Sequence, residues 1–169
     1  MSAHHTHADK HEAHRQLIVR LRQQSADVAR ITAGLDEASL AKRAKPEQWS
    51  LHELVCHLHR IQQLFEGRLD AVLAQDNPAV ASYMPDGDVE FERLTARPPH
   101  EAIRAFVEDR ERFALRLQEL SPAQWHRPGR HPDFPHYDVH FQIEYMVHHE
   151  GHHIYQMYQR RSPFGKIPH

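Results

Sequence analysis

The sequence predicts an all-α protein, a four-helix bundle with a long connection between its second and third helices. Apolar residues recur at helical spacing in four separate stretches, each long enough for a helix of several turns. No alternating strand pattern of convincing length appears between them. At 169 residues the chain has the length of one domain, and a single core suffices.

The amino-terminal part divides into a tail and a first helix. Residues 1–10 are rich in histidine and lack an apolar period, so we expect a disordered tail followed by a single domain over 11–169. An amphipathic pattern begins near Ala8 and stops at Gly34, a typical residue after a helix end. The inward positions of this first helix are His14, Leu17, Ile18, Leu21, Val28 and Ile31.

The start of the second helix is marked by Ser50 and Glu53, which have the spacing of a capping box. In this motif the Ser50 hydroxyl accepts from the Glu53 amide and the Glu53 carboxylate accepts from the Ser50 amide. We expect the helix to run to about Gln75. Trp49 fits a hydrophobic staple better than a ligand-stacking ring. The apolar stripe comprises Leu51, Leu54, Leu58, Ile61, Phe65, Leu69 and Val72.

A proline-rich connection over 76–99 follows, long enough for consecutive helices to lie parallel or apart. Its residues Tyr83, Met84 and Phe91 either cover the core or form part of a substrate pocket. The third helix is predicted over 99–120, with Glu101, Glu108, Asp109 and Glu111 on a solvated face.

Residues 121–135 are too rich in proline for regular structure, and His126, His131 and His136 are expected at the surface. The last helix is predicted from about residue 135 to Arg161. Its apolar stripe comprises Val139, Ile143, Met146, Val147, Ile154 and Met157.

Four of the 18 histidines stand in the middle of this last helix as two pairs four residues apart. At about 100° per residue, His149 and His153 fall at the edge of the apolar stripe. His148 and His152 fall nearly opposite it and face water. Glu150 falls near the centre of the stripe, so it is either functional or paired with a buried partner.

A catalytic zinc site typically has three protein ligands and an open position, so a third ligand should exist. His57 of the second helix lies at the edge of its stripe, whereas His52 and His59 point away from it. We therefore expect His57 to join His149 and His153 around one metal ion.

Composition argues against several other classes of protein. A net charge of −2 and a pI near 6.8 indicate no basic face for nucleic acid. Without a long apolar run or a signal-like amino terminus, we expect no membrane span, no cleaved signal and a cytoplasmic location. The single cysteine, Cys56, permits no internal disulfide, and its helical phase opposite the stripe argues against a Cys/His nucleophile.

The chain resembles the DinB-like superfamily, also called DinB/YfiT-type metal-dependent hydrolases, from about residue 12 to 162. The resemblance rests on Trp49-Ser50, Glu53 and His57-Leu58, followed by His149-Glu150-Gly151-His152-His153-Ile154-Tyr155-Gln156. It implies a four-helix bundle with one divalent metal, commonly zinc or nickel. One histidine of the second helix and an H-x-x-x-H pair of the last would hold it, which matches His57, His149 and His153. Iron and manganese also stay open, because imidazole suits several metals.

Three neutral imidazoles leave the ion its full charge, which acidifies a bound water and deprotonates a coordinated thiol. The resemblance implies a hydrolase or an S-transferase that uses a low-molecular-weight thiol such as bacillithiol or mycothiol. Glu150 and Gln156 are the candidate catalytic or supporting groups. The expected partner is a small-molecule substrate, and a homodimer is implied by the resemblance. The alternative is a non-catalytic, stress-linked bundle protein in which the metal stabilises the fold.

Overall fold

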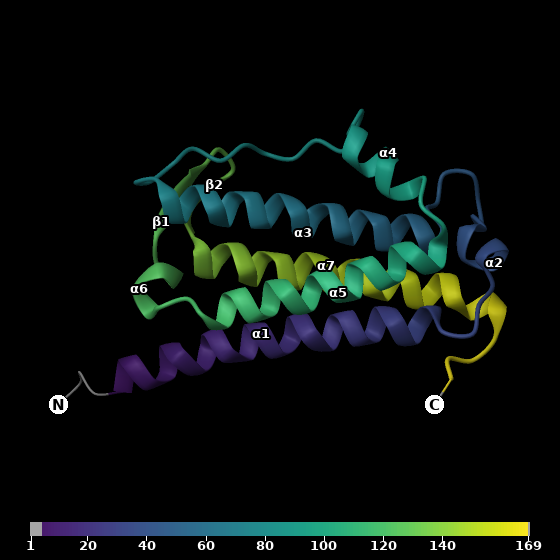
Figure 1. The fold of residues 1–169 in the computed structure, drawn as a ribbon, viewed down its shortest axis with the longest axis horizontal. Coiled ribbons are helices and arrows are strands. Elements are labelled where there is room, and N and C mark those ends of the chain that lie inside the picture. The colour runs from purple at the N-terminus through teal and green to yellow at the C-terminus, as the bar shows by residue number, and fades with distance from the viewer. Residues whose placement is uncertain (1–4, 169) are drawn as a thin grey trace.

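Four long helices form the protein, and the computed structural model describes residues 5–168, with side chains from residue 11 (Figure 1). The predicted all-α four-helix bundle is confirmed. Of the expected tail, residues 1–4 lie outside the described residues and the first helix begins at His5, so the boundary at residue 10 stays a prediction. The long helices are α1 (His5–Thr32), α3 (Leu51–Ala74), α5 (Pro99–Gln118) and α7 (Val139–Arg161).

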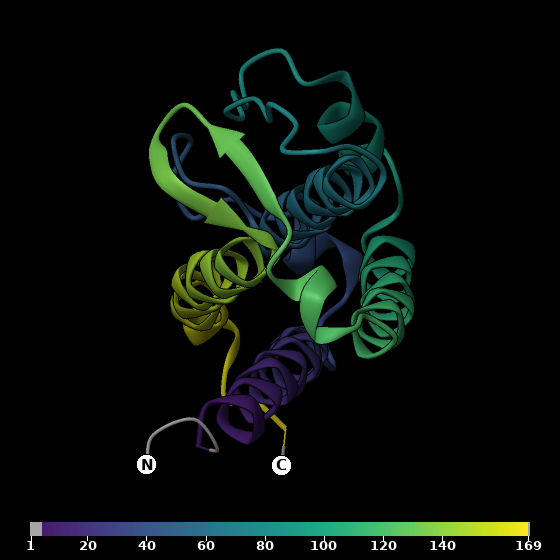
Figure 2. The same ribbon diagram turned by 90° about the vertical axis from the view of Figure 1, so that its left-hand side faces the viewer.

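The four helices occupy the corners of a square in the end view of Figure 2. α1 packs against α5 and α7, and α3 packs against the same two helices, so α1 lies diagonally across from α3. Figure 1 shows α3 and α5 running in the same direction, because the segment between them carries the chain back along the bundle. α3 and α7 run antiparallel, so the start of α3 lies beside the end of α7.

Short elements cap and connect the bundle. The capping box of Ser50 and Glu53 is present at the start of α3, as predicted. α1 ends at Thr32 and Gly34 follows with φ 74°, the left-handed conformation that favours glycine after a helix. The short helices are α2 (Glu37–Ala41), α4 (Val89–Thr95), α6 (Pro122–Trp125) and the 3-10 turn η1 (Ser162–Phe164).

The expectation of an irregular loop over 121–135 is wrong, because β1 (Pro128–His131) and β2 (Phe134–Asp138) form an antiparallel hairpin. The strands are too short to display a clear alternation. Pro128 stands at the first position of its strand, where a missing N–H is tolerated. The hairpin also moves the start of the last helix to Val139, where Asp138 accepts from the amide of Phe141 at 2.7 Å.

Residues 76–88, which we call the strap, run along α3 and join the hairpin (Figure 1). The amide of Val80 donates to the carbonyl of Arg130 at 2.9 Å, and the Arg130 amide donates to the Pro78 carbonyl at 2.8 Å. At the other end, Asp88 accepts from Arg60 Nε at 2.6 Å and from the Tyr83 hydroxyl at 2.8 Å. The strap is thus tied to the hairpin and to α3.

The side of α3 away from the main core is also buried, which the helical phase did not show. Cys56 packs with Leu94 of α4 and with α5, and burial raises the pKa of its thiol to about 12. His52 and His59 are buried as well. His59 Nε2 lies 2.5 Å from Asp109, so the expectation of a solvated Asp109 is wrong. Helices outside the bundle, such as α4, cover a face of α3 that four helices alone would leave exposed.

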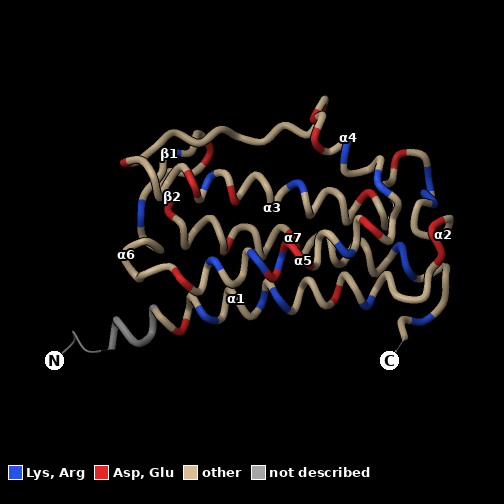
Figure 3. The backbone as a smooth tube through the Cα atoms, in the orientation of Figure 1, with Lys and Arg blue, Asp and Glu red and all other residues tan. Residues whose placement is uncertain are grey.

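Charged residues of both signs are interspersed along the helices, as Figure 3 shows. Several pair between helices, for example Arg22 of α1 with Glu111 of α5 at 2.7 Å. Within residues 5–168, no helix has the length and apolar character needed to cross a membrane.

Candidate metal centre

Three imidazoles from two helices meet at one point. Nε2 of His57 on α3 lies 3.5 Å from Nε2 of His149 on α7, and the latter lies 3.2 Å from Nε2 of His153. Each residue offers a ligand atom within 4.8 Å of the other two. Over the part of the chain that the structure describes, this is the only group of three or more histidine, cysteine or acidic side chains arranged in this way.

The spacing of these nitrogens fits a shared cation. A tetrahedral ion with metal–nitrogen bonds of about 2.0–2.1 Å keeps its ligating nitrogens about 3.3 Å apart. The two measured separations, 3.5 Å and 3.2 Å, lie on either side of that value. Nε2 of His149 can take part in one N–H···N hydrogen bond, either as the donor or as the acceptor. Hydrogen bonding between the rings therefore does not explain both contacts.

The site keeps its imidazoles neutral, which is the form that binds a metal ion. Burial, together with the neighbouring His153 and His149, lowers the pKa of His57 to about 3. Burial, with His153 and His152, lowers the pKa of His149 to about 4. The pKa of His153 is lowered by burial against the opposing effect of its hydrogen bond to Gln156.

Gln156 determines which nitrogen of His153 is free. Its Oε1 lies 2.8 Å from His153 Nδ1, and an amide oxygen only accepts, so Nδ1 carries the proton. The lone pair of His153 then stands on Nε2, toward the other two rings. Gln156 Nε2 lies 3.3 Å from His152 Nε2, which agrees with this orientation of the amide. Gln156 therefore orients a candidate ligand, His153, and is not itself one of the three clustered side chains.

Glu150 is not brought to the three histidines. It is buried in the bundle interior, with its carboxylate oxygens 2.9 and 2.7 Å from Arg110 of α5. Arg110 also donates to Gln62 of α3 at 2.7 Å and to the Leu21 carbonyl of α1 at 3.0 Å. Of the two expectations for Glu150, the structure shows the buried partner.

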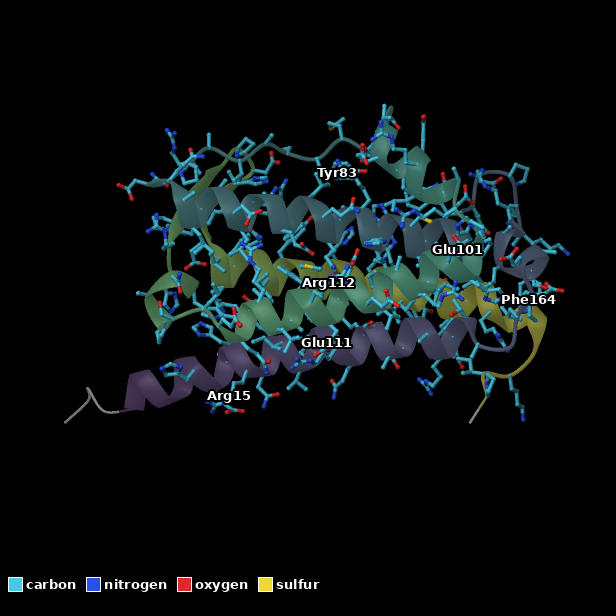
Figure 4. All side chains as sticks on the ribbon, viewed as in Figure 1. Arg15, Tyr83, Glu101, Glu111, Arg112 and Phe164 are labelled. Atoms are coloured by element: carbon cyan, nitrogen blue, oxygen red, sulfur yellow. The ribbon has the colours of Figure 1, made fainter. Side chains whose placement is uncertain are left out.

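A cavity of about 410 Å³ opens beside the three rings. Trp49 forms its wall at the histidine end, with its ring 4.9 Å from the ring of His57. Tyr83 reaches it from the strap and is labelled between strap and α3 in Figure 4. Met84 is 72% exposed, and Phe91 packs behind Trp49 with the rings 5.5 Å apart. Of the three strap and α4 residues considered beforehand, only Tyr83 lines the cavity.

The remaining walls were not predicted from the sequence. Phe65 and Tyr145 stack across α3 and α7 with centroids 6.1 Å apart. The hairpin contributes His131, whose imidazole is 5% exposed, so the expectation of a surface position is wrong for it, while His126 and His136 are exposed. The i, i+4 spacing from Tyr145 to His149 could have signalled one of these walls. The lining on the hairpin side comprises Arg68, Ser82, His131, Asp133, Phe134 and Tyr137.

Comparisons with known proteins agree with this architecture. A family model described as the DinB superfamily matches residues 20–157. The protein "Putative metal-dependent hydrolase BH0277" of Halalkalibacterium halodurans is 24% identical over 131 residues, which is 76% of this chain and 75% of that protein. The structure of YfiT from Bacillus subtilis is described as a probable metal-dependent hydrolase with an unusual four-helix bundle topology. It superposes with a TM-score of 0.76 at 20% identity, covers 90% of this chain and 87% of its own, and at that identity shows the fold alone.

Proposed function

Because this chain belongs to the DinB superfamily, we propose that it is a metal-dependent hydrolase with one divalent ion held by His57, His149 and His153. The observation that carries the proposal is the meeting of three neutral Nε2 atoms, at ligand spacing, beside a cavity of about 410 Å³. The name of the relative from Halalkalibacterium halodurans supports the reaction class.

An ion bound by three neutral imidazoles would keep its full double charge. It would lower the pKa of a bound water or thiol to near neutral or below. The protein contributes position and surroundings. Gln156 holds His153 in the tautomer that ligates. Trp49, Phe65 and Tyr145 present apolar rings to one side of the cavity. The ion pair with Arg110 holds the carboxylate of Glu150 in the bundle interior.

Thiol S-transfer is the second candidate, and one observation favours it. Among the residues that the structure describes, the histidine cluster includes no carboxylate, and Glu150 is paired with Arg110, so none of these residues places an acidic general base at the three imidazoles. A thiol needs no such base, because coordination deprotonates it outright. For the metal we propose zinc or nickel, the metals that the family resemblance implies. An all-imidazole donor set suits both, and it suits iron as well, whereas manganese prefers oxygen ligands.

Elemental analysis of untreated protein and its variants tests the site. We expect about one ion per chain in the native protein and its loss after dialysis in His57→Ala, His149→Ala or His153→Ala, because two imidazoles bind a divalent ion far more weakly than three. His148→Ala is the matched control, since that residue is exposed on the same helix. A variant with His4, His5 and His7 replaced by alanine removes binding by the histidine-rich first residues.

Full metal content in any of the three site variants, with helical content retained by circular dichroism, would contradict the site. Reaction class is tested with a panel of carboxylic esters and amides, and separately with a small thiol and an aryl halide. Hydrolysis that disappears in His57→Ala supports a hydrolase. Metal-dependent conjugation alone supports an S-transferase, and metal binding without either supports the non-catalytic alternative.

A further inference from the structure

The cavity beside the three histidines is elongated along α3. His57, Ile61, Phe65 and Arg68 all line it, at sequence intervals that keep them on one side of the helix. With a rise of 1.5 Å per residue, the backbone of Arg68 lies about 16 Å along the axis from that of His57. α7 runs antiparallel and places His149 and His153 at the His57 end. The hairpin closes the opposite end, where Arg68 stands.

Between the two ends the cavity has flat, apolar walls. Phe65 and Tyr145 are nearly parallel across α3 and α7, at an interplanar angle of 11°. Phe134 of the hairpin lies 5.4 Å from Tyr145, and Tyr137 completes this part of the lining. Such rings favour a flat apolar ligand, because aromatic rings prefer offset stacking on one another.

The far end carries the positive charge of Arg68. The Arg68 guanidinium lies 5.1 Å from the centroid of the Phe65 ring and donates to the Ala81 carbonyl at 2.5 Å. Burial raises the pKa of Tyr137, and the charge of Arg68 and a hydrogen bond with it oppose that rise. Among the residues that the structure describes, no carboxylate lies within 4.0 Å of it. On the same helix, by contrast, Arg60 pairs with Asp88 at 2.6 Å. A guanidinium has five donors in a planar fork that matches a carboxylate, so the contacts with Ala81 and Tyr137 leave Arg68 donors for a ligand.

The charge of Arg68 is felt inside the cavity. Burial lowers the pKa of His131, and the positive charge of Arg68 lowers it further, ahead of the opposing effect of Asp133. Asp133 stands at the outer edge of the cavity with its side chain 63% exposed, and its carboxylate accepts from the Ser82 hydroxyl at 2.5 Å. At His131, therefore, the positive charge of Arg68 outweighs the negative charge of Asp133.

We propose that this cavity binds a small carboxylic acid with a flat apolar body, and that Arg68 holds its carboxylate at the end away from the three histidines. The opposite end of such a molecule faces the proposed metal ion. The identity of the reacting group rests on the proposed function, whereas the anion site rests on Arg68 and the aromatic walls alone. The competing explanation is that Arg68 only anchors the strap through Ala81.

The test compares the affinity for a carboxylate with the affinity for the corresponding neutral amide. A loosened strap would affect both ligands alike, so it would not change the ratio of the two affinities. Isothermal calorimetry is carried out on the zinc-loaded protein with 4-(mercaptomethyl)benzoate and 4-(mercaptomethyl)benzamide. We expect the carboxylate to bind at least about tenfold more tightly, as a charge-assisted bidentate contact does. Arg68→Gln should reduce the two affinities to the same value, and Arg68→Lys should retain part of the preference.

Arg104→Gln is the matched control, because it removes the same charge from an exposed residue with no ion pair within 4.0 Å among those described. An unchanged carboxylate-to-amide ratio in Arg68→Gln, or the same loss in Arg104→Gln, overturns the proposal. A second pair, 4-methylbenzoate and 4-methylbenzamide, is titrated into His153→Ala and into His153→Ala/Arg68→Gln. Preference for the carboxylate only in the first variant supports the anion site whether or not a metal binds, and equal affinities in both overturn it.

Discussion

At the scale of single residues, the site depends on which ring nitrogen of each histidine is free. His153 is oriented by one amide, since Gln156 accepts from its Nδ1. The Nδ1 atoms of His57 and His149 are buried without such a partner, so only one of the three rings has a hydrogen-bond partner at Nδ1. We therefore expect the proposed centre to be sensitive to replacement of Gln156.

Replacing Gln156 with leucine should lower zinc affinity about 10- to 100-fold, because His153 loses the partner that orients its ring and sets its tautomer. Competition with a chromogenic chelator measures this change. Gln156→Glu should retain most of the affinity, since a carboxylate also accepts from Nδ1. Gln159→Leu, at an exposed position on the same helix, is the control. Equal zinc affinity in Gln156→Leu and Gln159→Leu would show that the amide has no part in the site.

At the scale of elements, the strap and the hairpin turn a helix pair into a cavity. α3 and α7 supply the three histidines, two aromatic walls, Ile61 and Arg68, and the remaining walls come from segments outside the long helices. Asp88 secures one end of the strap. Its Oδ1 accepts from the first amides of α4, and its Oδ2 accepts from Arg60 and Tyr83. Although burial opposes it, the hydrogen bond from Arg60 lowers the pKa of Asp88, and that from Tyr83 adds to this effect.

Asp88→Asn should increase hydrogen exchange in residues 78–88 and leave the long helices protected, because it weakens the contacts that hold the strap to α3. The same anchor predicts a pH dependence. A carboxyl pKa below its ordinary value of 3.8 stabilises the folded strap fully above that pH, and this contribution is lost as pH falls through the lowered pKa. Exchange corrected for the intrinsic effect of pH measures both. Asp86→Asn, at an exposed strap position, should change neither, and equal protection in the two variants would contradict the role of Asp88.

At the scale of the whole molecule, one buried arginine joins all four long helices. Arg110 extends from α5 to Glu150 of α7, Gln62 of α3 and the Leu21 carbonyl of α1. Both members of the ion pair are almost fully buried, with side chains 1% and 2% exposed. Such a pair contributes little net stability compared with apolar residues, but leaving one charge without its partner is costly.

Arg110→Met or Glu150→Leu alone should reduce the free energy of unfolding by about 3–5 kcal/mol, because each leaves a buried charge unpaired. The double variant should recover much of that loss. Urea denaturation, with the single variants and the double variant forming a cycle, measures the coupling. We also expect the folded double variant to keep its metal, since Glu150 does not face the histidine cluster. Additive losses in the cycle would contradict the pairing, and a folded double variant without metal would give Glu150 a role in the site.

Much of the framework was predictable from local patterns. The capping box at Ser50 and Glu53 and the stop at Gly34 follow from backbone hydrogen-bonding rules, so short stretches of sequence contain them. Helical phase separated His149 and His153 from His148, and the structure brings the first two to His57. That these three hold an ion stays a prediction. The hairpin was missed because its strands are short and contain proline, and burial around Cys56 was missed because α4 covers it from outside the four-helix pattern.

The sequence by itself determined the four long helices and the phase of the three histidines, because helix formation and helix faces depend on residues within a few turns of one another. Only the tertiary structure decided that Glu150 meets Arg110 and that Arg68, the strap and the hairpin close a cavity beside His57. Those contacts join segments far apart in the chain. They depend on the packing of α3 against α7 and on the return of the connection along α3, which no local pattern specifies.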